Sequence, residues 1–208
     1  MTMNEQSNYP KKELGKENNR RKTLEEIKIS KFPGDWDIKV VKNLFNIMVE
    51  RRDPSKLNTI VKHYSMPSFD ENQKPVNEHS EEINSMKNLV PSTTLLFPKL
   101  NIRKKRFWLV NEKHDKPALA STEYWPLIPK EDLNLYFYKF YFLSHHFMSN
   151  PKVSTSSSTN SHQRVTKKFF KSIKLPTPPL PEQRKIATIL YNVDQAIQKT
   201  EKIIEQTK

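Results

Sequence analysis

The stretch from Pro176 to Lys208 constrains the fold of this chain more than any other part of the sequence. Prolines at positions 176, 178, 179 and 181 exclude a helix interior before Glu182, because proline lacks a backbone N–H and has a fixed φ. Pro181 suits the first helical position, and Glu182 places a negative charge at the positive end of the helix dipole. A long helix is therefore predicted from here to the last residue.

This helix is predicted to carry an apolar seam. Its members follow alternating spacings of four and three, with Thr200 in the one slot that is not apolar: Ile186, Leu190, Val193, Ile197 and Ile204. Such a/d spacing requires a facing helix. The sequence contains no second long heptad segment, so we expect a truncated spacer helix whose partner comes from a second copy, a longer subunit, or residues that this sequence lacks. The alternative is that the helix packs on its own domain.

Composition narrows the classes of partner and excludes several chemistries. The chain has 208 residues, a formal net charge of +13 and a pI near 9.7, which favours nucleic acid first and an anionic membrane surface second. The lack of cysteine excludes disulfides and cysteine-ligated zinc, and only two glycines exclude glycine-rich phosphate loops and the usual loop for S-adenosylmethionine. No signal core or membrane-spanning run is present, which predicts a cytoplasmic protein without a membrane partner.

The chain is expected to divide into three segments. Residues 1–24 are polar and predict a disordered basic tail, residues 25–178 a mixed α+β domain, and residues 179–208 the long helix. Within the domain, Trp36 to Val40 predicts a strand and Val41 to Phe45 a helical turn. Pro67 predicts an edge or irregular strand over His63 to Pro75. Short strands follow from Leu89 to Pro129, and Glu131 to Met148 predicts one internal helix.

Two basic segments are candidates for DNA contact. Asn101 to Arg106 reads NIRKKR between two predicted strands, where cations can bind phosphates, although such a run is as often a solvated face. The loop from Val153 to Phe170 offers Gln163 and Arg164, which can read adenine and guanine, or can equally brace the loop. The full predicted set is Lys99, Arg103, Lys104, Lys105, Arg106, His162, Gln163, Arg164, Lys167 and Lys168.

Neither a catalytic site nor a metal site is expected in the chain. His63 and Asp70 are interpreted as residues that satisfy local backbone groups in a structured loop. His145 and His146 are adjacent and point in different directions, so they cannot share a metal ion. Carboxylates lack the clustering of a nuclease, and no Asn/Asp-Pro-Pro-Tyr/Phe segment of an amino-methyltransferase is present. The residues describe a protein that recognises rather than transforms its partner.

Several motifs resemble the specificity subunit of type I restriction–modification enzymes. The strongest is PPLPEQRKIATILYNVDQAI, and the others are HYSMPSFDENQKP, LVPSTTLLFPKL, ALASTEYWPLIP and His-Gln-Arg-Val at 162–165. One departure is that the loop before His162 carries serines where the family often has glycine, so a loop conformation with positive φ would cost more here. The resemblance implies an α+β fold with an irregular curved sheet, one internal helix and a long C-terminal coiled-coil helix.

The resemblance also implies a function. Residues 25–178 would be one DNA target recognition domain that binds double-stranded DNA and directs methyltransferase and restriction subunits to a site. No cofactor is expected in this chain, whereas the partner methyltransferase would use S-adenosylmethionine. A second specificity half, or a second copy joined through the helix, is a further expected partner. The alternatives are the recognition domain of a fused type II restriction–methyltransferase and a general basic nucleic-acid-binding module.

Overall fold

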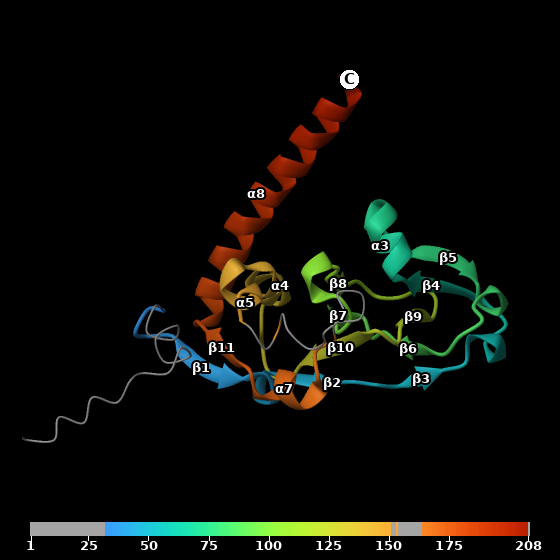
Figure 1. The fold of residues 1–208 in the computed structure, drawn as a ribbon, viewed down its shortest axis with the longest axis horizontal. Helices are drawn as coiled ribbons and strands as arrows, with labels where there is room; N and C mark the ends of the chain where they lie inside the picture. The colour runs from blue at the N-terminus through green and yellow to red at the C-terminus, as the bar shows by residue number, and fades with distance from the viewer. Residues whose placement is uncertain (1–31, 151–152, 154–163, 208) are drawn as a thin grey trace, which may run out of the picture. The chain divides into compact units, whose positions relative to one another are not determined.

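A computed structural model describes residues 32–150, 153 and 164–207 (Figure 1). The chain divides into two units, Met1–Pro33 and Gly34–Lys208, and every described strand and helix belongs to the second. The predicted tail of residues 1–24 lies outside the described residues. Within the described part, no helix is both long enough and apolar enough to cross a membrane.

Three small sheets make up the β-structure of the described residues (Figure 1). The four-stranded sheet has the order β2 (Phe45–Ile47), β10 (Tyr124–Pro129), β7 (Thr93–Pro98) and β8 (Trp108–Asn111). The five-stranded sheet has the order β3 (Arg51–Arg52), β6 (Lys87–Leu89), β9 (Ala118–Ser121), β4 (Ile60–Tyr64) and β5 (Val76–His79). The two-stranded sheet pairs β1 (Asp37–Val40) with β11 (Lys174–Thr177). All pairs are antiparallel except β4–β9. The strand and helical turn predicted near Trp36 correspond to β1 and α2 (Val41–Leu44).

The helices inside the domain are more numerous than the single one that was predicted. One of them, α3 (Met66–Asn72), lies where an irregular strand was predicted, and that prediction is wrong. Pro67 occupies the first turn of α3, where its missing N–H breaks no hydrogen bond. The side chain of Ser65 accepts a hydrogen bond from the Ser68 backbone, and the Ser68 side chain accepts one from the Ser65 backbone. This capping box starts the helix.

The helix predicted over Glu131 to Met148 is shorter and interrupted. It consists of α4 (Leu135–Leu143) and α5 (His145–Met148). Asn134 caps α4 by accepting a hydrogen bond from the Phe137 N–H at 3.0 Å, so the chain before it is not helical. Ser144 has extended backbone angles and caps α5 in the same way, which separates the two helices. Apolar periodicity continues across such a break, and for that reason the pattern suggested one helix.

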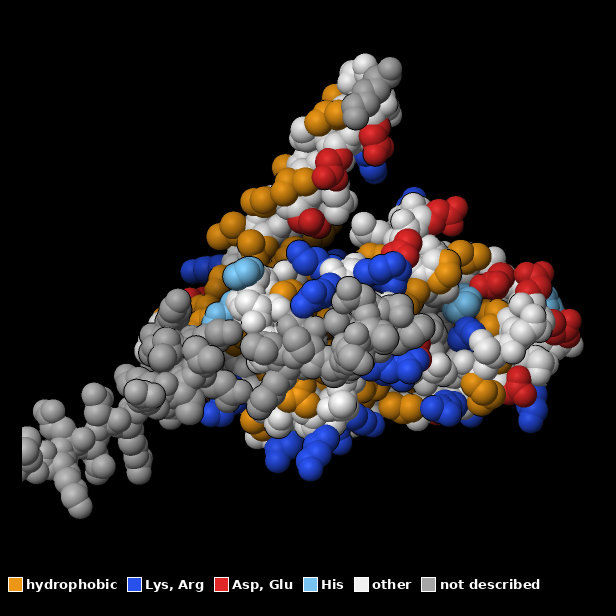
Figure 2. All heavy atoms as spheres, in the orientation of Figure 1, with side chains coloured by type: hydrophobic (Ala, Val, Ile, Leu, Met, Phe, Trp, Pro, Cys, Tyr) orange, Lys and Arg blue, Asp and Glu red, His pale blue; other side chains and the backbone are white. Residues whose placement is uncertain are grey.

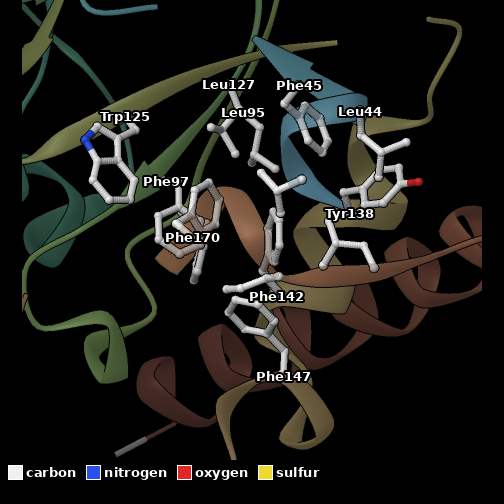
Figure 3. Close-up of a cluster of buried hydrophobic side chains, with 14 of the residues drawn as sticks. Leu44, Phe45, Leu95, Phe97, Trp125, Leu127, Tyr138, Phe142, Phe147 and Phe170 are labelled. Atoms are coloured by element: carbon white, nitrogen blue, oxygen red, sulfur yellow. The ribbon is translucent and has the colours of Figure 1, made fainter. Parts of the chain in front are cut away.

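The main hydrophobic core lies between the four-stranded sheet and α4 (Figure 3). Phe97 of β7 is at its centre, fully buried, with its ring centroid 4.2 Å from that of Phe170 and 5.3 Å from that of Phe142. Trp125 of β10 stacks on Phe97 at 6.0 Å. Phe170 belongs to α7 (Lys167–Ser172), a helix that overlaps the end of the span predicted as a loop, Val153 to Phe170. The aromatic packing ties the strands to both helices.

The long helix α8 (Leu180–Gln206) begins at the prolines, as predicted. Its first turn is fixed by side-chain hydrogen bonds: the Trp36 indole donates to Glu182 at 3.0 Å, and Gln183, 1% exposed, accepts from the Asn134 N–H and donates to the Pro178 carbonyl, each at 2.9 Å. Ala187 is buried against the core, and Tyr191 makes an edge contact with a tyrosine of α4. The Pro-Glu-Gln block therefore anchors the start of α8 to the domain.

Candidate nucleic-acid interface

The basic run predicted as a turn forms the connection between β7 and β8. Its centre is the 3₁₀ turn η3 (Ile102–Lys104), which is flanked by two residues in left-handed backbone conformation, Asn101 with φ 50° and Lys105 with φ 55°. Ile102 is 3% exposed and holds the turn on the core. Arg103, Lys104 and Lys105 are exposed, and none of them forms an ion pair with the described residues. The turn thus presents three cations from a fixed backbone.

Arg106 differs from its three exposed neighbours because its side chain is nearly buried and bonded to a carboxylate of the domain. Its side chain is 9% exposed and forms two hydrogen bonds to Asp70 of α3, from Nε to Oδ1 at 2.6 Å and from Nη2 to Oδ2. The hydrogen bonds from Arg106 hold the pKa of the Asp70 carboxyl below its usual value. A guanidinium that is buried and engaged in this way favours a structural role for Arg106 over the predicted phosphate contact. Asp70 therefore accepts hydrogen bonds from a side chain, and not from the local backbone groups that the sequence suggested.

Arg164 is also engaged by a carboxylate. Its guanidinium donates from Nε and Nη2 to Glu123 at 3.1 and 2.9 Å, and Lys99 lies 4.0 Å from the same carboxylate. Arg164 also pairs with Leu100 through an isolated β-bridge. These contacts favour the bracing role over base reading for Arg164. His162 and Gln163 lie outside the described residues, so their predicted DNA contacts stay predictions.

Lys167 and Lys168 lie on α7, a different element from η3. Both are exposed, and α7 is capped by Thr166, whose hydroxyl accepts from the Phe169 N–H. The described members of the predicted DNA-binding set thus come from three places: the β7–β8 connection with the η3 turn, the Glu123 cluster and α7.

The apolar seam of α8 faces solvent. Leu190 is 39% exposed, Val193 51%, Ile197 52% and Ile204 49%, while Ile186 alone is packed against the core. The domain instead contacts another face of the helix, through Gln183, Ala187 and Tyr191. The alternative that the seam packs on its own domain therefore does not hold in this structure.

His63 has a structural environment. Its Nδ1 lies 2.6 Å from Glu78 Oε1 on the neighbouring strand, and burial lowers the pKa of its imidazole below 6.5, against the opposing effect of Glu78. Among the described residues, no group of three or more His, Asp or Glu side chains could hold a metal ion. His63 thus pairs with a side chain and not with the backbone groups that were expected.

The lowered pKa of His63 predicts a pH dependence of stability. The unfolded chain takes up a proton near pH 6.5 and the folded chain only below that value, so stability present above pH 6.5 is lost as the pH falls through the folded pKa. Urea unfolding of the wild type should show a lower midpoint at mildly acidic pH, and His63→Gln should reduce this difference. An undiminished pH dependence in His63→Gln would assign it to other groups.

Sequence reasoning missed the backbone requirement of the η3 turn. Asn101 offered a signal, since asparagine directly after a strand is among the few residues that tolerate a left-handed conformation. Lys105 offered none, because lysine is not favoured there. The sequence drew attention to Asp70 but could not identify its partner. That partner, Arg106, is distant in the sequence and is one of several similar cations in the NIRKKR run.

Comparisons with known proteins support the fold. The family model for the type I restriction modification DNA specificity domain matches residues 33–208. A chain from a structure on complex assembly and conformational transition of the type I R-M system aligns with TM-score 0.67 and 20% identity, covering 83% of this chain and 45% of that chain. The HsdS subunit from Thermoanaerobacter tengcongensis gives TM-score 0.65, with the same identity and coverage.

The S subunit of a type I restriction-modification system from M. genitalium aligns with TM-score 0.52 and 16% identity, over 82% of this chain and 42% of that one. No curated protein sequence matches the chain. The chain spans less than half the length of the solved chains, and the similarity confirms the predicted α+β fold with its long C-terminal helix.

Proposed function

Because the chain belongs to the type I restriction–modification DNA specificity family, we propose that it is a non-catalytic recognition module that directs methyltransferase and restriction subunits to a DNA site. Residues 25–178 supply one target recognition domain, and α8 is the start of the spacer. The methyltransferase, and not this chain, uses S-adenosylmethionine. The DNA-binding part of this proposal rests on the η3 turn. Its buried residue Ile102 holds the turn on the core, and the three exposed cations of the turn form no ion pair with the described residues.

The backbone of η3 supports a binding role for Lys105. An L-residue in the left-handed region costs about 1–2 kcal/mol, and glycine would avoid that cost. Lys105 occupies this position with φ 55° and ψ 32°, and its side chain is exposed. Strained positions that persist are concentrated at functional sites. A lysine here adds a cation to the turn at the expense of stability, which is consistent with contact to DNA phosphates.

The experiment uses a matched pair of glycine substitutions. Gln73, at the end of α3, has φ 54° and ψ 32°, nearly the same conformation as Lys105. Lys105→Gly and Gln73→Gly should each raise the free energy of unfolding by a few tenths to about 1 kcal/mol, since the relieved strain exceeds the added chain entropy. Only Lys105→Gly should weaken duplex binding and lower the salt slope by about 0.9.

Fluorescence anisotropy with a labelled duplex over a range of salt concentrations, together with urea unfolding, measures both effects. If Lys105→Gly binds with the wild-type slope, or if Gln73→Gly loses as much affinity, Lys105 is not a phosphate contact and η3 is not the interface.

A further inference from the structure

A second group of cations surrounds α7, on elements that the η3 turn does not include. Helix α7 packs against α2, and β11 follows α7 directly. Exposed lysines on these elements and at the end of β10 form what we call the lysine face: Lys42, Lys130, Lys167, Lys168, Lys171 and Lys174. Only two of the six, Lys167 and Lys168, were suggested by the sequence motifs.

Hydrogen bonds bring these lysines into one neighbourhood. Lys130 Nζ donates to the backbone carbonyl of Lys42 at 2.9 Å, and its backbone N–H donates to Leu44 of the same helix. The backbone of β11 pairs with β1, where Lys174 lies opposite Val40, next to the start of α2. Figure 2 shows Lys and Arg side chains gathered at the lower edge of the molecule, where Figure 1 places α7. The lysine face is therefore one surface built from distant parts of the sequence.

Carboxylates neutralise many cations elsewhere in the described part of the chain, but not those of the lysine face. Lys39 pairs with Glu131, and Lys62 pairs with Glu112. Arg106 pairs with Asp70, and Arg164 pairs with Glu123. None of the ion pairs among the described residues includes a member of the lysine face. From residue 164 to residue 181 the sequence has five cations and no carboxylate. Like charges held together without ion pairs among the described residues favour an anionic partner.

We propose that the lysine face binds the phosphate backbone of duplex DNA at a place separate from the η3 turn. This inference rests on the proposed function. Lysine ammonium groups act as point charges and lack the fork with which arginine binds guanine, so the surface suits backbone contact and not base reading. The lysine face adds affinity that is independent of sequence and leaves selection of the site to other residues.

The test compares two variants that carry the same change in charge. The face variant combines Lys42→Gln, Lys130→Gln, Lys171→Gln and Lys174→Gln, and it spares Lys167 and Lys168, which the sequence motifs already suggested as DNA contacts. The control variant combines Lys56→Gln, Lys74→Gln, Lys113→Gln and Lys199→Gln, which are exposed on other elements. Each set lowers the formal net charge from +13 by 4 to +9. Affinity for a labelled duplex of arbitrary sequence is measured at several salt concentrations.

The face variant should lose about 0.9 from the slope of log affinity against log salt for each phosphate contact removed, and the control variant should keep the wild-type slope. Both should unfold at the wild-type urea midpoint. The inference is overturned if the face variant keeps the wild-type slope, or if it binds DNA normally and instead loses binding to phosphatidylserine vesicles. If the wild type itself does not bind duplex DNA, the proposed function fails as well.

Discussion

Asp70→Ala is expected to lower the free energy of unfolding by about 2–3 kcal/mol, a large loss for a residue whose own side chain is half exposed. The reason is its partner. Arg106 is nearly buried, and removing Asp70 leaves a guanidinium without its counter-charge and without two hydrogen bonds. Arg106→Met removes the buried charge and should cost less, because methionine fills much of the same apolar volume.

Two comparisons make this prediction specific. The double variant Asp70→Ala/Arg106→Met should be more stable than Asp70→Ala alone, since no unpaired charge is left behind. Glu123→Ala breaks the exposed two-bond pair with Arg164 and should cost less than about 1 kcal/mol. Urea unfolding of the wild type and of the four variants (Asp70→Ala, Arg106→Met, their combination and Glu123→Ala) measures these losses. Equal losses for Asp70→Ala and Glu123→Ala would show that burial of Arg106 does not set the energy of its pair.

Leu190→Lys and Ile197→Lys are each expected to weaken strongly the association that α8 provides. Both side chains are exposed in the single chain, so neither substitution should lower the stability of the domain. In a helix pair each would lose burial of a large apolar side chain, roughly 1.5–3 kcal/mol, which corresponds to about a 10- to 100-fold weaker association. Asn192→Lys, on the same helix but outside the seam, is the matched control.

Sedimentation of each variant, alone and with a methyltransferase subunit, measures the effect. The control should co-sediment like the wild type, and the two seam variants should not. If Leu190→Lys and Ile197→Lys still assemble and still direct methylation, α8 is not the assembly element. If the partner is a second copy of the chain, its two-fold symmetry predicts an interrupted palindrome as the DNA site.

The sequence predicted the features that depend on local chemistry. The prolines before Glu182 defined the start of α8 to within a residue or two, and alternating apolar residues found β1. The same reasoning failed at Pro67, where proline begins a helix, because the Ser65–Ser68 capping box departs from the usual pattern with glutamate or glutamine. Local pattern could not distinguish a breaker from a first-turn proline.

The sequence could predict that the candidate site is rich in basic residues, but not which of them are exposed and unpaired. In the run NIRKKR, the exposed Lys104 and Lys105 and the buried Arg106 look alike, and only the tertiary position of Asp70 separates them. Four of the six members of the lysine face were missed for the same reason, since the face is assembled from three separate stretches of the chain. Which cations meet a carboxylate is decided by packing, and packing is not visible in the order of residues.

Selection from a pool of random duplexes, with the full chain and its methyltransferase subunit together, tests the central claim most directly. A DNA specificity module should enrich one defined sequence, and the enrichment should disappear when the chain is omitted. Lys105→Gly should bind the same sequence more weakly, because phosphate contacts do not select bases. Recovery of the unselected pool, with binding that depends on salt alone, would contradict the account and would indicate a general basic module instead.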